Sequence, residues 1–237
     1  MENLGRIFIL LAVCLGLGNA QTVGPGKCPT GQTFKANFEA EKYVGNWFEI
    51  QSYPSSFQAG LKCSHAIYTP KSFAVIEVKN SGTFVANNTV SQVIGTAYIP
   101  DPINEPAKLI VGFPPMNGKG GYWVMDTDYT SYSVVYSCAQ IGENQKIEFA
   151  WVLSRTKTLS DAINQIVQEV LTRNSIDQTP FQKTSQEGCA NHPEVGSSTG
   201  RPDVTSVTGS GNGAGTVTFA LTTGWISVAI TMLLARF

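Results

Sequence analysis

The sequence has few residues that bind metals or act as nucleophiles. It contains two histidines, His65 and His192, and no Cys-x-x-Cys pair, so a zinc site is not expected. It also lacks the Gly-x-Ser-x-Gly, His-Glu-x-x-His, P-loop and Gly-x-Gly-x-x-Gly motifs that accompany common active sites. We therefore predict that the chain is not an enzyme and needs no metal or cofactor.

An excess of one charge is absent as well. The chain has 16 Lys and Arg residues against 17 Asp and Glu residues, which gives a formal net charge of -1. This balance creates no basic field that would attract phosphate backbones. Nucleic acid is therefore not an expected partner.

The N-terminus has the pattern of a secretory signal peptide. A short basic stretch ends at Arg6, an apolar run follows from Ile7 to Leu17, and small residues stand at Gly18 and Ala20. The alternative is an uncleaved anchor, but the run is shorter than the roughly 20 residues that span a bilayer. We predict removal of residues 1–20 and secretion of the remainder.

Cleavage would also remove Cys14 and leave an even number of cysteines. Four cysteines in an oxidising compartment indicate two disulfides, and sequence alone leaves all three pairings open. The absence of a free thiol argues against a lipid isomerase with a nucleophilic cysteine. The four are Cys28, Cys63, Cys138 and Cys189.

The C-terminal part reads as a stalk followed by an anchor signal. Residues 193–215 are rich in Gly, Ser and Thr, which favours a flexible segment, and residues 216–237 are mainly apolar. This pattern predicts glycosylphosphatidylinositol (GPI) attachment at Ser210, Gly211 or Asn212 and a place on the outer cell surface. A membrane span and an incidental apolar terminus are the alternatives.

Residues 21–192 are expected to form one folded domain with β-rich runs separated by turn signals, among them Asn80-Ser81-Gly82. No crossover helix interrupts the runs, so we predict an all-β fold, an eight-stranded antiparallel up-and-down barrel. The predicted strands are Trp47 to Tyr53, Ser64 to Tyr68, Phe73 to Lys79, Val90 to Ile99, Lys108 to Phe113, Tyr122 to Asp126, Ser133 to Cys138 and Lys146 to Ser154.

One amphipathic helix is predicted after the last strand. Thr158 and Asp161 have the spacing of a capping box, and Arg173 with Asn174 suits the helix end. The helix should lie outside the barrel, with an extended piece after it around Phe181 to Thr184. Its apolar positions are Ile163, Ile166, Val167, Val170 and Leu171.

The order of landmarks along the chain resembles the lipocalin family. Gly45-x-Trp47 opens the first strand, Thr127-Asp128-Tyr129 ends a later one, and Arg155 precedes the helix and the final Cys189. Stretches such as Lys42 to Ile50 and Phe149 to Arg155 are similar to the apolipoprotein D branch, and the predicted anchor suits a Lazarillo-like member. The resemblance implies that Arg155 packs over Trp47 at the closed end, and that the disulfides are Cys28–Cys138 and Cys63–Cys189.

The resemblance also implies a ligand site inside the barrel, with contacts from Tyr43, Asn80 and Trp151. An interior lined by apolar and aromatic groups favours a small hydrophobic ligand: a fatty acid, sterol, retinoid-like molecule or pigment. A bilin is less favoured because neither histidine is well placed. The side chains expected to point inward are Tyr43, Tyr68, Val111, Phe113, Tyr136, Phe149 and Trp151, with Asn80 near the mouth.

Three further expectations concern the surface. Asn87-Asn88-Thr89 predicts glycosylation at Asn87. Apolar residues in two loops at the open end either contact a lipid surface or fold inward as a lid; they are Phe57, Leu61, Pro115 and Met116. The alternative to a carrier is a GPI-linked recognition or adhesion protein in which the cavity is secondary.

Overall fold

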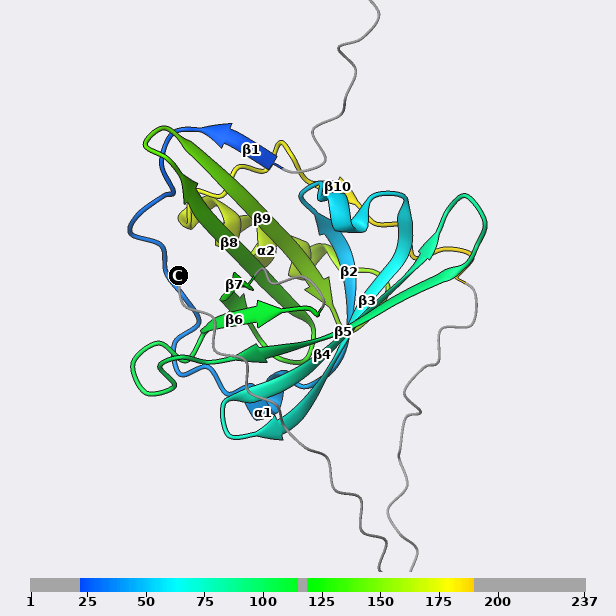
Figure 1. The fold of residues 1–237 in the computed structure, drawn as a ribbon, viewed down its shortest axis with the longest axis horizontal. Helices are drawn as coiled ribbons and strands as arrows, with labels where there is room; N and C mark the ends of the chain where they lie inside the picture. Colours follow the sequence, from blue (N-terminus) through cyan, green and yellow to red (C-terminus); the bar gives the residue numbers. More distant parts are fainter. Residues whose placement is uncertain (1–21, 115–118, 190–237) are drawn as a thin grey trace, which may run out of the picture. The chain divides into compact units, whose positions relative to one another are not determined.

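The computed structural model describes residues 22–114 and 119–189, and its main feature is a closed barrel (Figure 1). Each barrel strand pairs antiparallel with the next, and β9 also pairs with β2, which closes the ring. The predicted eight-stranded barrel is thus confirmed. Its strands are β2 (Gly45–Ser52), β3 (Leu61–Ser72), β4 (Val75–Phe84), β5 (Val90–Tyr98), β6 (Lys108–Gly112), β7 (Lys119–Thr127), β8 (Tyr132–Ile141) and β9 (Gln145–Ser154).

Short elements complete the described part of the chain. Strand β1 (Thr22–Pro25) pairs with β9, and β10 (Gln182–Lys183) pairs with β2, where an extended piece was predicted. Helix α1 (Ala40–Tyr43) and the 3-10 helix η1 (Ser56–Gln58) are too short to leave a periodic signal in the sequence. No helix in these residues is long and apolar enough to cross a bilayer.

Two apolar clusters lie on opposite faces of the barrel wall. The inner cluster fills the barrel toward the end where β2 begins, and the outer cluster lies between β8, β9 and helix α2 (Asp161–Arg173). Among the fully buried inner side chains are Trp47, Leu109, Val124 and Val135, and the outer cluster includes Val134, Val152, Val167, Val170 and Leu171.

Helix α2 lies outside the barrel as predicted, but its N-cap differs from the prediction. The Ser160 hydroxyl accepts the backbone N–H of Ile163 at 3.4 Å, so Ser160 caps the helix, and Thr158 lies before it. Val167, Val170 and Leu171 are buried and carry the packing against the sheet. Asn174 ends the helix as its C-cap.

The turn predicted at Asn80-Ser81-Gly82 is wrong, because these residues lie inside β4. Ser81 pairs with His65 of β3 and with Gln92 of β5, so the segment is hydrogen-bonded on both sides. The Gln92 side chain also donates to the Ser81 hydroxyl at 3.2 Å. Two neighbouring strands thus override a local composition that favours a turn.

The closed end of the barrel is built around Trp47. The Arg155 guanidinium lies 3.7 Å from the centre of the Trp47 ring and donates to the backbone oxygens of Asn46 and Tyr129. Gly45 has φ +96, and a Cβ there would lie 3.3 Å from Arg155 Nη1. Only glycine meets both the backbone conformation and the close approach without strain.

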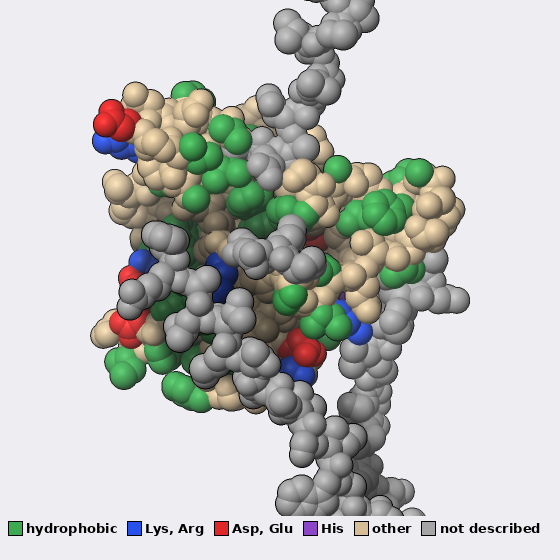
Figure 2. All heavy atoms as spheres, viewed as in Figure 1, with side chains coloured by type: hydrophobic (Ala, Val, Ile, Leu, Met, Phe, Trp, Pro, Cys, Tyr) green, Lys and Arg blue, Asp and Glu red, His purple; other side chains and the backbone are tan. Residues whose placement is uncertain are grey.

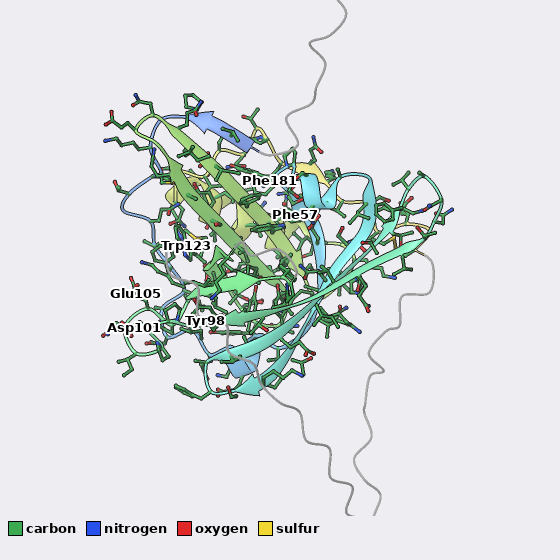
Figure 3. The ribbon with its side chains drawn as sticks, viewed as in Figure 1. Phe57, Tyr98, Asp101, Glu105, Trp123 and Phe181 are labelled. Atoms are coloured by element: carbon green, nitrogen blue, oxygen red, sulfur yellow. A yellow bond between two sulfur atoms is a disulfide. The ribbon has the colours of Figure 1, made fainter. Side chains whose placement is uncertain are left out.

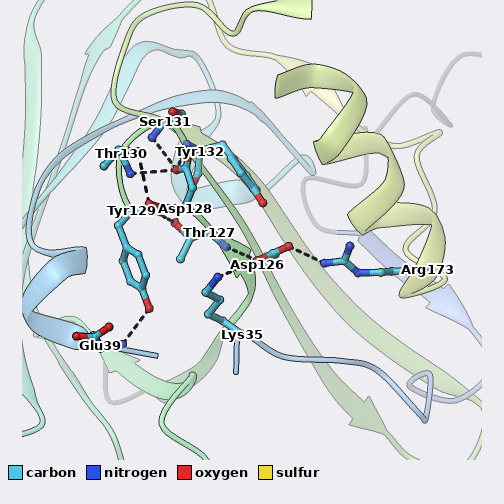
Figure 4. A network of polar contacts seen from close by, with 10 residues as sticks. All are labelled: Lys35, Glu39, Asp126, Thr127, Asp128, Tyr129, Thr130, Ser131, Tyr132 and Arg173. Carbon is cyan, nitrogen blue, oxygen red and sulfur yellow. Dashed lines mark hydrogen bonds and ion pairs between the residues drawn. The ribbon is translucent and has the colours of Figure 1, made fainter. Parts of the chain in front are cut away.

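The Thr127-Asp128-Tyr129 segment shapes the turn between β7 and β8 (Figure 4). The Asp128 carboxylate accepts backbone N–H groups from Thr130, Ser131 and Tyr132, at 3.0, 2.7 and 3.1 Å. Although partial burial opposes it, this bonding lowers the pKa of Asp128. Asp128 therefore acts as an anionic cap for the turn.

Two disulfides join the arms of the domain to the barrel. Cys28 bonds to Cys138 on β8, and Cys63 on β3 bonds to Cys189. This is the pairing that the family resemblance implied. The second bond holds the C-terminal arm beside β2 and β3, where the Gln186 amide donates to the backbone oxygens of Glu49 and Ser64.

Candidate functional site

The lower interior of the barrel is filled by aromatic side chains. Tyr43 is the last residue of the short helix α1 at the closed end. It is 1% exposed, and Trp47 is 0% exposed. Their rings lie 5.1 Å apart, and the Trp47 indole donates to the backbone oxygen of Tyr43 at 2.9 Å. Together these rings form the floor above which any ligand would have to lie.

A chain of four hydroxyl groups rises from this floor. Tyr43 Oη lies 2.8 Å from Ser133 Oγ and 2.9 Å from Tyr122 Oη, which in turn lies 2.8 Å from Tyr68 Oη. Burial raises the pKa of Tyr43 to about 12 and raises those of Tyr68 and Tyr122 further. The phenols are thus neutral, and each can donate one hydrogen bond and accept others.

Above the hydroxyl chain, the inward-facing side chains are only partly buried. Strand register places Trp151 opposite Val135 and Phe149 opposite Ser137, on the same face as the buried Leu153. The Phe149 and Trp151 rings are stacked 5.8 Å apart. Like these two residues, Val111, Phe113 and Tyr122 are only partly buried, and they pack against the inner cluster.

Asn80 also belongs to the inner face of the barrel. It pairs with Ala66 of β3, and it is two residues from the buried Val78. Because side chains alternate along a strand, Asn80 shares the inward face with Val78. It brings a polar amide to a wall that is otherwise apolar at this point.

Tyr136 does not point inward, so that prediction was wrong. Its ring belongs to the outer cluster with Val167 and Leu171, and its hydroxyl donates to Glu148. The neighbouring Trp123 ring lies 6.4 Å from the Tyr136 ring and packs against the same outer cluster. Helix α2 covers this side of β8, which removes Tyr136 from the candidate ligand site.

A carboxylate lies buried in the wall where the barrel opens. Glu49 is 6% exposed, and its oxygens accept hydrogen bonds from Ser52, Gln58 and Thr184. Burial raises the pKa of Glu49, and these three bonds oppose the rise. Within the described residues no Lys or Arg forms an ion pair with it.

Comparisons with known proteins agree with this architecture. A family model described as a Lipocalin-like domain matches residues 38–186. Apolipoprotein D of Macaca fascicularis is 37% identical over 179 residues, which cover 76% of this chain and 93% of that protein.

This chain belongs to the lipocalin family.

Two further lipocalins show the breadth of the likeness. The Lazarillo protein of Schistocerca americana is 30% identical over 163 residues, covering 67% of this chain and 76% of that protein. The solved structure of insecticyanin from the tobacco hornworm Manduca sexta aligns with a TM-score of 0.62 and 26% identity, covering 71% of this chain and 92% of that one. The similarity to apolipoprotein D places this lipocalin in the corresponding branch.

Two residues of the lipocalin interior were not predicted from the sequence. Tyr122 is two residues from the buried Val124 on β7, and Glu49 is two residues from Trp47 on β2, so each pair shares the inner face of its strand. This spacing of two residues was the signal in the sequence that could have identified both. A carboxylate in phase with a floor tryptophan is unusual, because isolated charges are costly to bury.

Several predicted residues lie outside the part of the chain that the structure describes. They are Pro115 and Met116 of one mouth loop, and the attachment residues Ser210, Gly211 and Asn212.

Proposed function

We propose that this lipocalin is an extracellular carrier that holds one small hydrophobic ligand inside its barrel. The supporting observation is the combination of partly exposed inward aromatics with a single chain of hydroxyls beneath them. Binding sites for small ligands are mainly apolar with a few placed polar groups, and an eight-stranded barrel has room for one such ligand. Tyr43, Tyr68, Asn80, Phe149 and Trp151 are the proposed contacts.

Counting hydrogens indicates how such a ligand would be oriented. Four hydroxyls carry four hydrogens, and the three contacts between them use three. Ser133 is fully buried, so leaving its hydrogen unused would be costly. The favourable order runs from Ser133 through Tyr43 and Tyr122 to Tyr68. Among the described residues the Tyr68 hydrogen then has no acceptor, and a ligand oxygen would supply one.

The proposed ligand is therefore a molecule with an apolar body and one acceptor oxygen, as in a fatty acid or a sterol ketone. The oxygen would lie toward Tyr68, and the body would lie between Trp151, Phe149 and the strands opposite. A purely hydrocarbon ligand would leave the Tyr68 hydrogen unpaired. Ligands with an oxygen should therefore bind more tightly than their hydrocarbon analogues.

Titration with a fluorescent polyene fatty acid tests this proposal. Tyr68→Phe should weaken binding by about two- to tenfold, the range expected for one neutral hydrogen bond. Tyr98→Phe is the matched control, because Tyr98 lies on β5 out of phase with the inward Ala97 and has no hydroxyl contact among the described residues. Equal affinity of the Tyr68 and Tyr98 variants would contradict the proposed orientation.

We also propose that the carrier is tethered to the outer cell surface by a GPI anchor, with Ser210, Gly211 or Asn212 as the attachment residue. The support is the order of small residues, spacer and apolar end in the sequence. A phosphatidylinositol-specific phospholipase should release the protein from cells. Retention on the membrane after this treatment would favour the membrane span instead.

The open end carries exposed apolar residues that suit contact with a lipid surface. At the tip of the β4–β5 hairpin Phe84, Val85 and Val90 are 40%, 61% and 45% exposed, and Phe57 of η1 is 51% exposed (Figure 2). Leu61, in contrast, packs against Gly82. We propose lipid contact by the hairpin tip; Val85→Ser should slow ligand transfer from liposomes, and an unchanged rate would refute it.

A further inference from the structure

The loop between β2 and β3 lies at the open end of the barrel and touches residues of the proposed ligand site. Phe57 on η1 lies 5.7 Å from the inward Phe149 ring (Figure 3). One residue further, Gln58 accepts the Trp151 indole N–H through Oε1 at 3.1 Å. The loop thus contacts both aromatic rings that line the upper interior.

Gln58 connects Trp151 to the buried Glu49. The Gln58 amide donates through Nε2 to Glu49 Oε2 at 2.5 Å, while its oxygen accepts from Trp151 and from Ser55 Oγ. An ionised carboxylate can only accept, and an indole N–H can only donate. The two groups therefore fix the orientation of the amide between them, and no flipped amide satisfies both.

Glu49 itself has no freedom to move away from Gln58. Its other oxygen accepts from Ser52 at 3.1 Å and from Thr184 on the C-terminal arm. The arm is held in turn by the Cys63–Cys189 disulfide and by Gln186. The carboxylate is thus fixed to the barrel wall, whereas Gln58 belongs to a loop with an exposed face.

We propose that Glu49, acting through Gln58, holds the loop from Pro54 to Gly60 closed over the interior and positions the Trp151 indole, so that this relay sets how fast ligand enters and leaves. Glu49 and Gln58 are positioning residues here, since neither needs to touch the ligand. The effect on the rates of ligand entry and release rests on the proposed carrier function. The hydrogen bonds that hold the loop closed do not depend on a ligand.

Breaking the relay should change rates more than affinity. In Gln58→Met, a side chain of similar length makes neither hydrogen bond, so the loop opens more often. The association and dissociation rate constants of the fluorescent fatty acid should both rise by at least about tenfold, the lower end of the range expected for one hydrogen bond to a charged group. The dissociation constant should change by less than about threefold, because both rates rise together.

Glu49→Gln provides a second variant that keeps the side-chain volume. The new amide can keep its oxygen toward Gln58 only by turning its NH2 group toward Ser52 and Thr184, whose hydroxyls must then accept instead of donate. The bond from Gln58 then goes to a neutral oxygen and is weaker, so a smaller rise in both rate constants is expected, together with a shift in Trp151 emission. Gln92→Met is the matched control, because it removes one glutamine hydrogen bond to Ser81 on the outer wall.

Hydrogen–deuterium exchange of residues 55–60 measures loop opening without any ligand. The proposal expects faster exchange in Gln58→Met and Glu49→Gln than in the wild type and in Gln92→Met. Unchanged exchange and unchanged rate constants in both relay variants would overturn it. If the wild type bound no probe, the carrier function would fail, whereas the exchange data would still decide whether the relay closes the loop.

Discussion

At the residue scale, the closed end depends on the packing of Arg155 over Trp47, and only glycine at position 45 leaves room for it. The left-handed backbone at Gly45 and the nearby Arg155 guanidinium both exclude a side chain. The guanidinium is in turn held by backbone oxygens of Asn46 and Tyr129. The Gly45-x-Trp47 motif therefore has a structural role at the closed end, and the proposed ligand contacts come from residues nearer the open end.

Gly45→Ala should lower the free energy of unfolding by about 1 to 3 kcal/mol, because it combines backbone strain with a close contact to Arg155. Urea unfolding measures the change. Gly120→Ala on β7 is the control, since a Cβ there meets nothing within 4 Å and its φ is not in the left-handed region. Equal stability of the two variants would show that the close approach to Arg155 is not important.

Buried phenols give a second prediction at this scale. The pKa of Tyr43 is raised to about 12, and those of Tyr53, Tyr68, Tyr122, Tyr132 and Tyr136 are raised too, each chiefly by burial. A raised folded pKa stabilises the fold below the unfolded value near 10, and this contribution is lost as pH rises through the folded value.

Spectroscopic titration should therefore show delayed ionisation of most of the eight tyrosines. At about pH 11, above the ordinary tyrosine pKa, the folded protein should form far less phenolate than the same protein in denaturant. Stability should fall as the pH rises above about 10. Equal phenolate absorbance in the folded and denatured samples would contradict the buried hydroxyl chain.

At the element scale, helix α2 is joined to the barrel by a narrow apolar face and by an ion pair at its last turn. Val167, Val170 and Leu171 pack on β8, and Arg173 forms an ion pair with Asp126 at 2.6 Å (Figure 4). Asp126 also contacts Lys35 at 3.4 Å, so the helix end and the N-terminal arm meet at one carboxylate. These partly exposed ion pairs are expected to add little beside the apolar packing.

The assignment of the N-cap leads to a direct prediction. Ser160→Ala should cost about 1 kcal/mol, the usual loss for a removed N-cap side chain. Thr158→Ala, at the position that the capping-box spacing favoured, should change stability little, because the exposed Thr158 side chain forms no hydrogen bond within the described residues. A larger effect at Thr158 than at Ser160 would reverse this assignment.

Strand β8 shows how far sequence reasoning can reach. Tyr136 was expected to point inward, but it shares the outer face with Tyr132 and Val134. All residues from Tyr132 to Ser137 are buried, since the barrel covers one side and α2 the other. The other face, with Ser133 and Ser137, is the more polar one, and yet it lies inside, because α2 covers the tyrosine face. Periodicity therefore shows which side chains share a side and not which side is inside.

Strand β9 was predicted better because its two faces differ along part of its length. Phe149 and Trp151 lie on the inner face, with Lys146 and Glu148 in the opposite phase.

The turn prediction at Asn80-Ser81-Gly82 was wrong for another reason, since the pairing of this segment with β3 and β5 depends on residues outside the segment itself. The contact between Glu49 and Gln58 was also beyond reach, because it needs the loop in three dimensions.

At the scale of the whole molecule, two disulfides close long segments of the chain. The bonded cysteines are separated by 110 and 126 residues. On the chain-entropy estimate each bond stabilises the fold by about 4 to 5 kcal/mol. Cys63→Ser with Cys189→Ser should therefore lower the urea midpoint strongly. A midpoint close to that of the wild type would mean that the C-terminal arm is held by hydrogen bonds alone.

Asn87 offers a further test at the molecular surface. It lies exposed at the β4–β5 hairpin, and its side-chain oxygen accepts from the backbone and hydroxyl of Thr89 at 3.0 and 2.7 Å. The protein expressed through a secretory pathway should lose mass on treatment with an N-glycosidase, and Asn87→Gln should show no such loss. An unchanged mass of the wild type would exclude occupancy in the host used.

Native mass spectrometry of the lipocalin isolated from its own source tests the carrier function most directly. The carrier function predicts one hydrophobic adduct per barrel, containing an acceptor oxygen, which an added fatty acid or sterol can displace. An empty barrel that also fails to take up added fatty acids, sterols and retinoids would contradict it and would favour a recognition protein.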